Sequence, residues 1–155
     1  MRLSISEYFM KMAFVVAERS TCRRHHVGAV ATRNKHVLAT GYNGAIAGLK
    51  DCLELGCLRD QTDLESGFRV EVCRAVHAEQ NVLVQASLHG VSLEGATVYC
   101  THAPCLWCAK ALANARIKAF VWCFDYEGFD IAPFKDVRVE HYVLAEPNLS
   151  ISVRS

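Results

Sequence analysis

Apolar side chains recur along the first part of the chain with the spacing of an amphipathic helix. Ser4 and Glu7 stand three residues apart at its start, which is the capping-box pattern of a helix N-terminus. The pattern predicts a helix over about 6–19 with one buried stripe. The stripe consists of Phe9, Met12, Ala13, Val16 and Ala17.

Four later runs are short, apolar and rich in β-branched or aromatic residues, which is typical of buried strands, and a fifth has alternating apolar character. These runs cover 27–31, 36–40, 96–101, 119–124 and 137–144. The polar residues 33–35 predict a turn that joins the first two runs as an antiparallel hairpin. Two segments, 73–89 and 105–116, have apolar residues at helical spacing instead. Strands that alternate with helices predict an α/β fold, a three-layer α/β/α sandwich around a mixed sheet of about five strands.

Composition narrows the class of protein further. The 155 residues fit a single domain over 1–155, in which the polar and aperiodic stretch 51–73 is a Cys-rich insertion. Lys and Arg number 17 against 16 Asp and Glu, and the resulting net charge of +1 argues against a nucleic-acid partner. The apolar stretch 10–17 is too short to span a membrane and lacks the charge order of a signal peptide. We therefore expect a cytoplasmic protein, in which eight cysteines favour metal binding over disulfides.

Two short motifs supply three metal-ligating side chains and a carboxylate. Cys105 and Cys108 lie one helical turn apart behind Pro104, and His77 precedes Glu79 by two residues. Two thiolates and one imidazole fill three corners of a tetrahedral zinc site and leave the fourth for water, as catalytic zinc requires. Glu79 then stands where it could carry the proton of that water. A redox dithiol is disfavoured by the absence of a thioredoxin-like context, and a closed structural zinc site would need a fourth protein ligand.

Several segments, taken together and in order, resemble the deoxycytidylate (dCMP) deaminases of the cytidine deaminase superfamily. These segments are 23–30, 39–45, 56–59, 66–67, 73–81 and 104–110. The zinc motifs alone are shared with cytidine, guanine, riboflavin-precursor and transfer-RNA adenosine deaminases. The Gly-Tyr-Asn-Gly run at 41–44 and the Cys-rich insertion narrow the resemblance to deoxycytidylate. It implies a cytidine-deaminase-like fold and hydrolytic deamination of dCMP to dUMP and ammonia, a step of pyrimidine nucleotide biosynthesis that feeds thymidylate synthesis.

The resemblance also implies roles for single residues. His77, Cys105 and Cys108 would hold the catalytic zinc, and Glu79 would be the catalytic proton shuttle. The substrate-binding positions are Asn43, Ala78 and Tyr126. Asn43 is equally well explained as a turn residue, and Tyr126 as a core aromatic. The 5′-phosphate needs positive charge, for which the candidates are Arg23, Arg24, Arg59 and Arg74.

Four further cysteines flank or lie in the insertion, namely Cys22, Cys52, Cys57 and Cys73. Cys22 and Cys52 resemble positions that bind a second, structural zinc in some relatives. Four thiolates would form a closed tetrahedral site and would pin the aperiodic insertion to both neighbouring elements. The alternative is four reduced cysteines without a metal.

Regulation and assembly are expected from the resemblance alone. It implies dCTP and dTTP as effectors and a hexamer as the homo-oligomer, although Gln85 and Leu88 stand where at least one regulated branch has an aromatic residue and an arginine. Two alternative functions stay open: another nucleotide, nucleoside or base deaminase, and a zinc-stabilised accessory protein of the competence-operon type without catalysis. Glu79 argues against the second alternative, because a purely structural zinc site would not need it.

Overall fold

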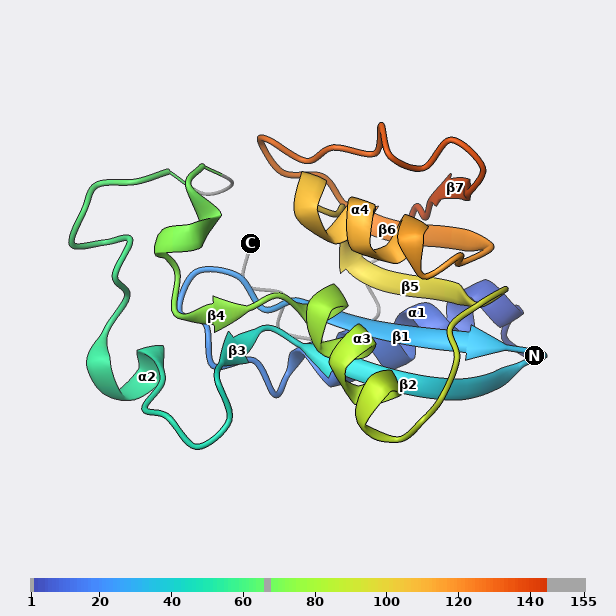
Figure 1. Cartoon of the computed structure of the whole chain (residues 1–155), viewed down its shortest axis with the longest axis horizontal. Helices are drawn as coiled ribbons and strands as arrows, with labels where there is room; N and C mark the ends of the chain where they lie inside the picture. The colour runs from blue at the N-terminus through green and yellow to red at the C-terminus, as the bar shows by residue number, and fades with distance from the viewer. Residues whose placement is uncertain (1, 66–67, 145–155) are drawn as a thin grey trace.

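A mixed five-stranded sheet forms the centre of the computed structural model, which describes residues 2–65 and 68–144 (Figure 1). The strands lie in the order β2-β1-β5-β6-β7. Their bounds are Gly28–Arg33 for β1, His36–Tyr42 for β2, Thr97–His102 for β5, Ala119–Phe124 for β6 and Arg138–His141 for β7. β1 is antiparallel to β2 and to β5, whereas β6 is parallel to both β5 and β7. The predicted mixed sheet is confirmed.

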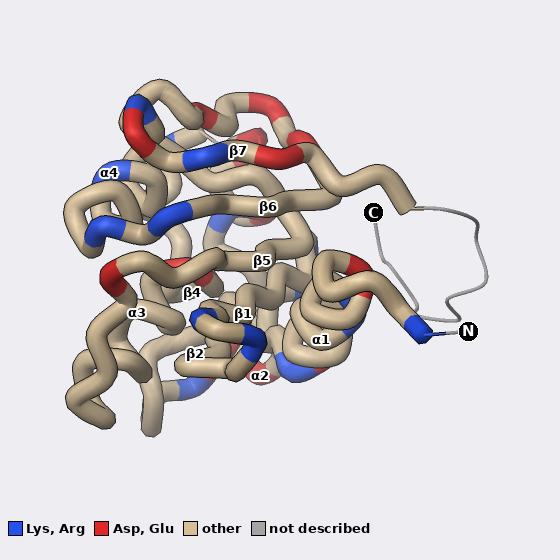
Figure 2. The backbone as a smooth tube through the Cα atoms, turned by 90° about the vertical axis from the view of Figure 1, so that its right-hand side faces the viewer, with Lys and Arg blue, Asp and Glu red and all other residues tan. Residues whose placement is uncertain are grey.

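Helices cover both faces of this sheet, as the edge-on view in Figure 2 shows. Helix α1 (Ile5–Ala17) packs on one face, and its N-terminus is capped by Ser4, whose Oγ accepts a hydrogen bond of 3.1 Å from the Glu7 amide. Helices α3 (Ala78–Leu88) and α4 (Leu106–Asn114) pack on the opposite face. The predicted three-layer sandwich is therefore confirmed.

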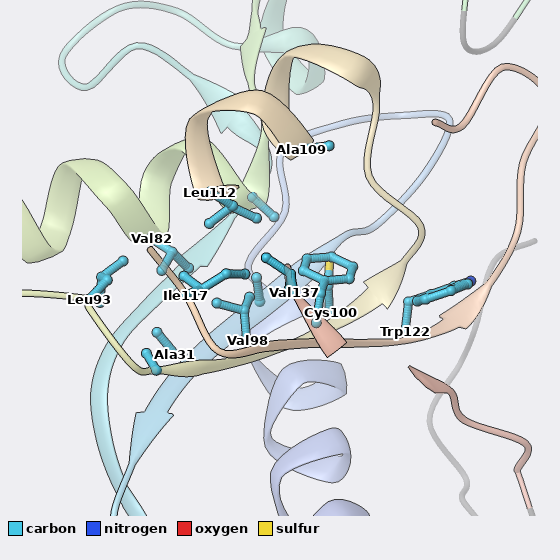
Figure 3. Close-up of a cluster of buried hydrophobic side chains, with 14 of the residues drawn as sticks. Ala31, Val82, Leu93, Val98, Cys100, Ala109, Leu112, Ile117, Trp122 and Val137 are labelled. Atoms are coloured by element: carbon cyan, nitrogen blue, oxygen red, sulfur yellow. The ribbon is translucent and has the colours of Figure 1, made fainter. Parts of the chain in front are cut away.

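Buried apolar side chains fill the space on each side of the sheet. Val82 of α3, Leu112 of α4 and Val98 of β5 are fully buried in the larger cluster (Figure 3). Phe9 and Met10 of α1 are 1% exposed in the cluster on the other face. Both clusters include residues of β1, β5 and β6, so the two cores fix the sheet between its helices.

Helix α3 lies directly against the backbone of β2. A Cβ atom added at Gly41 would lie 2.3 Å from the carbonyl oxygen of Ala78 and 2.6 Å from the amide nitrogen of Val82. Only glycine permits so close an approach. The contact fixes the N-terminal end of α3 against the sheet, and His77 is the N-cap of this helix.

The predicted helix over 73–89 begins too early. Residues Ala75–Val76 form the short strand β4, which pairs antiparallel with β3 (Gly44–Ala45). His77 is therefore the N-cap of α3 and does not lie in its first turn. Cys105 is likewise the N-cap of α4, and this helix ends at Asn114, two residues before the predicted end.

The insertion over 51–73, of which the structure describes 51–65 and 68–73, contains little regular structure in those ranges. It holds the short helix α2 (Cys52–Leu55), capped by the side chain of Asp51, and the 3₁₀ turn η1 (Val70–Val72). Figure 1 shows this region extending from one end of the sheet, beside β3 and β4. Within the described ranges, no helix has the length and apolar character needed to cross a membrane. The single-domain organisation over 1–155 stays a prediction.

Candidate functional site

The structure brings the imidazole and the two thiols of the sequence motifs together. Nδ1 of His77 lies 3.5 Å from Sγ of Cys105 and 3.4 Å from Sγ of Cys108. The three ligand atoms all lie within 4.8 Å of one another, and they form the only such group of three or more among the described residues. The N-termini of α3 and α4 thus meet at one site, where their partial positive charges favour thiolates.

The spacing of these atoms fits zinc. Bonds of about 2.3 Å to sulfur and about 2.0–2.1 Å to nitrogen, at tetrahedral angles, separate sulfur and nitrogen ligands by about 3.6 Å. The two distances from His77 Nδ1, 3.5 and 3.4 Å, are close to this value. Two thiolates with one imidazole are also a donor set that zinc prefers, and they leave one tetrahedral position for a ligand that the protein does not supply.

The backbone around His77 holds its ring in place. The amide of His77 donates a hydrogen bond of 2.9 Å to Oε1 of Gln80, which caps the helix and leaves the imidazole facing the thiols.

Hydrogen bonds with Cys108 and His77 lower the pKa of the Cys105 thiol to about 4. The pKa of Cys108 is raised, chiefly by the same hydrogen bond and by burial. A divalent cation bound by both sulfurs would stabilise both as thiolates.

Glu79 is a buried carboxyl beside this ligand set. Its side chain is 4% exposed, and it interacts with the thiol of Cys108. Burial raises the pKa of Glu79 to about 7, and the nearby His77 partly opposes this shift. A carboxyl with such a pKa can both accept and donate a proton near neutral pH.

His77 lines a cavity that is open to solvent. The volume of this cavity, with the space at its mouth included, is about 780 Å³. The residues that line this active-site cavity include His25, Asn43, Ala78, Glu79, His102 and Tyr126. The lining is mostly apolar and carries a few polar groups, as expected of a site for a small molecule. All three residues that the sequence suggested for substrate binding therefore face the same space as Glu79.

Asn43 also holds the loop that precedes β1. Its Oδ1 accepts hydrogen bonds from the hydroxyl of Ser20 (2.5 Å) and the amide of Val27 (2.9 Å). Its Nδ2 donates to the carbonyl oxygen of His25 at 2.8 Å. One N–H of the amide is left for a ligand, so this residue positions the loop and can still contact a molecule in the cavity.

Ala78 and Tyr126 are the other two lining residues that the sequence suggested for substrate binding. Ala78 is fully buried at the start of α3, between His77 and Glu79 in the sequence. Tyr126 packs against Phe129 with ring centroids 6.4 Å apart, and burial raises the pKa of its hydroxyl. It is thus both a core aromatic and a wall of the cavity.

Two of the four arginines that were candidates for phosphate binding line the cavity, namely Arg24 and Arg59. Arg23 and Arg74 are not among the lining residues in the part of the chain that the structure describes. Arg74 instead has a buried Nε without a hydrogen-bond partner. Burial and the neighbouring cysteines raise the pKa of Cys52, and the positive charge of Arg74 partly opposes this rise, so Arg74 lies near the cysteines of the insertion.

The four cysteines of the predicted second site are neighbours but do not form a closed tetrahedron. The charges of Cys73, Cys22 and Cys57, after burial, raise the pKa of Cys52. Backbone amides two residues downstream donate hydrogen bonds to the sulfurs of Cys22 (3.4 Å) and Cys73 (3.5 Å). Among the described residues, no three of these sulfurs lie within 4.8 Å of one another.

The sequence interpretation missed His102 and His25 as residues of the cavity. His102 ends β5 and stands two residues before Pro104, where the chain turns from the sheet edge into α4. A polar residue at the carboxyl end of a central strand, next to a metal motif, was the signal that could have identified it.

Comparisons with known proteins agree with this geometry. A family model of the cytidine and deoxycytidylate deaminase zinc-binding region matches residues 3–124. The chain is 40% identical over 126 residues to ComE operon protein 2 of Bacillus subtilis, covering 81% of this chain and 62% of that protein. It is 38% identical over 125 residues to the deoxycytidylate deaminase of Schizosaccharomyces pombe, covering 81% of this chain and 38% of that protein. The chain thus spans less than two thirds of either curated relative.

A solved structure gives the same picture at the level of the fold. The dCMP deaminase from the cyanophage S-TIM5, in complex with dCMP and dUMP, matches with a TM-score of 0.74 and 32% sequence identity. The match covers 92% of this chain and 99% of that one.

Proposed function

The chain belongs to the cytidine and deoxycytidylate deaminase family, and from that premise we propose that it catalyses the hydrolytic deamination of dCMP to dUMP and ammonia. The observation that carries the proposal is the meeting of His77, Cys105 and Cys108 at a cavity that also contains the buried carboxyl of Glu79. The relative whose structure contains dCMP and dUMP supports the choice of substrate.

We propose that His77, Cys105 and Cys108 hold a zinc ion and that Glu79 moves the protons of the reaction. A zinc ion held by these three residues would supply a nucleophile, because zinc lowers the pKa of bound water from ~16 towards ~7. Glu79 would accept one proton of that water and deliver it to the ring nitrogen N3 of cytosine as oxygen bonds to C4. It would then accept the second proton, from the new hydroxyl on C4, and pass it to the departing amine as the C4–N bond breaks. One water is consumed and one ammonia is released, so atoms and charge balance.

Burial gives Glu79 its role in this scheme. The low exposure of the carboxyl excludes bulk water, so its proton exchanges with the substrate and not with solvent. His77 is the N-cap of α3 and Glu79 is the second residue of this helix. The helical backbone therefore fixes the position of the carboxyl relative to His77. Asn43 and Tyr126 are proposed to contact the sugar and the base from the walls of the cavity.

A second candidate function follows from the similarity to ComE operon protein 2, namely an accessory protein that keeps the fold without turnover. A third is deamination of another nucleoside or base. Zinc-loaded protein assayed side by side with dCMP, deoxycytidine, CMP and guanine separates the three. Turnover of dCMP above the others supports the proposal, a different preferred substrate supports another deaminase, and no turnover of any supports the accessory function.

We further propose a structural zinc ion bound by Cys22, Cys52, Cys57 and Cys73. The amide hydrogen bonds to the sulfurs of Cys22 and Cys73 support this proposal, because such bonds stabilise thiolates at metal sites. A contraction of the cysteines to sulfur–sulfur distances of about 3.8 Å would be needed to close the site. Metal analysis of the purified protein tests it, since two zinc ions per chain are expected and one would refute the second site.

We also propose how the chain assembles and how its activity is regulated. We propose a homo-oligomer, a hexamer by family resemblance, in which exposed apolar residues of α3 and α4 are covered. Val84 is 46% exposed, Leu88 72% and Trp107 63%, and apolar groups of this size favour burial against a partner. Sedimentation equilibrium tests the subunit number. Assays with dCTP and dTTP test activation and inhibition, and location in the cytoplasm stays a prediction.

A further inference from the structure

The positive charges at the active-site cavity are already hydrogen-bonded to the protein. Arg24 donates from Nε and Nη2 to Oδ1 of Asp60, at 2.9 and 2.7 Å, and from Nη1 to the carbonyl oxygen of Leu64 at 2.7 Å. Arg59 is 6% exposed and donates to the carbonyl oxygens of Glu65, Phe68 and Arg69. Both charges would therefore attract an anion in the cavity, but most of the guanidinium N–H groups already donate hydrogen bonds to residues 60–69.

Of the two ring nitrogens of His102, Nδ1 has a hydrogen-bond partner and Nε2 has none among the described residues. Its Nδ1 lies 2.9 Å from the hydroxyl oxygen of Thr101, which also accepts a hydrogen bond of 3.2 Å from the Gly28 amide. The Thr101 hydroxyl is fully buried and has its own hydrogen left to donate, and Nδ1 is the acceptor within reach. The imidazole then carries its hydrogen on Nε2.

The His102 ring packs against two other rings beside the cavity. The ring lies against Phe124 at 5.4 Å and against His25 at 6.0 Å between centroids. In the part of the chain that the structure describes, Nε2 has no hydrogen-bond partner and is not fully enclosed. Because His102 lines the cavity, the Nε2–H group is a donor that a ligand can reach. Burial lowers the pKa of His102 to about 4, so the ring is neutral at pH 7.

The two arginines act on the same part of the cavity as this imidazole. The positive charges of Arg24 and Arg59 lower the pKa of His25, after burial, so both guanidinium groups lie near the His25 ring. The His25 and His102 rings are in edge contact. One neutral N–H donor and two fixed positive charges therefore converge, which is the combination that a phosphate monoester requires.

We propose that Nε2–H of His102 hydrogen-bonds the 5′-phosphate of the nucleotide, while Arg24 and Arg59 supply positive charge from the loop that they hold together. The inference rests on the proposed function, because it requires a nucleoside monophosphate in the cavity. The arginines set the potential and the shape of this end of the cavity, and His102 supplies the hydrogen bond. Thr101 is a positioning residue, since it fixes which nitrogen of His102 carries the hydrogen.

The test is steady-state kinetics of the zinc-loaded full chain and of the variants His102→Phe and His102→Gln. We expect His102→Phe to raise KM for dCMP and Kd for dUMP by about 10- to 100-fold, the value of a hydrogen bond to a charged group, with kcat within about threefold of wild type. The kcat/KM for deoxycytidine, which has no phosphate, stays within about threefold. His102→Gln keeps an N–H near the position of Nε2 and restores most of the affinity for dUMP.

Three results would overturn the inference. These are an unchanged KM in His102→Phe, an equal loss for dCMP and deoxycytidine, and a His102→Gln variant as weak as His102→Phe. If His102→Phe fails to fold, judged by zinc content and urea unfolding, His102→Asn replaces it, because its shorter amide cannot reach the position of Nε2. Wild-type protein that neither turns over dCMP nor binds dUMP would refute the proposed function instead, so the two failures are distinguishable.

Discussion

Gly41→Ala should damage the active site from the opposite side of helix α3. The added Cβ would lie 2.3 Å from the carbonyl oxygen of Ala78, whereas ordinary contacts begin at 3.4 Å. Helix α3 or strand β2 must therefore move by about 1 Å to accept one methyl group. The displaced end of the helix carries His77 and Glu79, so the imidazole and the carboxyl move together relative to the thiols of Cys105 and Cys108.

The expected magnitudes follow from that displacement. Overpacking of this kind costs about 1–3 kcal/mol of unfolding free energy. A misplacement of about 1 Å at the reacting groups lowers activity by about 100-fold. Urea unfolding and kcat/KM for dCMP, both on zinc-loaded protein, measure the two effects.

The matched control is Gly44→Ala, three residues away on the same segment. There the nearest atom to the added Cβ is Oγ1 of Thr21 at 2.9 Å, a hydroxyl that can rotate aside. This variant should lose less than about 1 kcal/mol of stability and keep activity within a few-fold of wild type. A Gly41→Ala protein with wild-type stability and activity, or a control that is equally damaged, would refute the reasoning that places α3 by backbone contact.

Three further predictions concern the second metal site, a buried histidine and the core. Cys57→Ser should lower the zinc content from two ions per chain to one and reduce the melting temperature, as measured by metal analysis and calorimetry; an unchanged zinc content would contradict it. The pKa of His102 is about 4 in the folded chain against 6.5 unfolded, so its contribution to stability is complete above pH 6.5 and is lost as pH falls towards 4. Urea unfolding at pH 7 and pH 5 should therefore show wild type losing about 2 kcal/mol more than His102→Asn, and equal losses would contradict the buried neutral ring. Leu112→Ala, at a fully buried position, should cost about 2–5 kcal/mol, whereas Leu49→Ala, at a side chain that is 65% exposed, should stay within about 0.5 kcal/mol in the same unfolding measurement.

The sequence was sufficient where local pattern and tertiary packing agree. The apolar run at 119–124 is strand β6 with the predicted bounds, and the hydroxyl of Ser4 caps α1 as its position before Glu7 indicated. Both features depend on neighbouring residues alone, so periodicity and capping chemistry identify them. The sequence also indicated that His77, Cys105 and Cys108 would lie together, because the spacing of the two cysteines places both thiols on one face of a helix.

Features that depend on distant partners were not predicted. Ala75 and Val76 continue the helical spacing of the residues after them, but they pair with Gly44 and Ala45 and form β4. The proposed phosphate contact of His102 depends on the hydroxyl of Thr101. This hydroxyl accepts a hydrogen bond from the amide of Gly28 in β1, which lies 73 positions away in the sequence. Neither contact leaves a local pattern in the sequence, so only the folded chain reveals them.

The central claim is that Glu79 carries protons for a zinc ion held by His77, Cys105 and Cys108. The most direct test measures dCMP deamination and zinc content together in Glu79→Gln, which keeps the shape of the side chain and removes its proton chemistry. The account predicts unchanged zinc content and a fall in kcat of about 10²- to 10⁴-fold. A variant that keeps its zinc and deaminates dCMP at the wild-type rate would contradict the account.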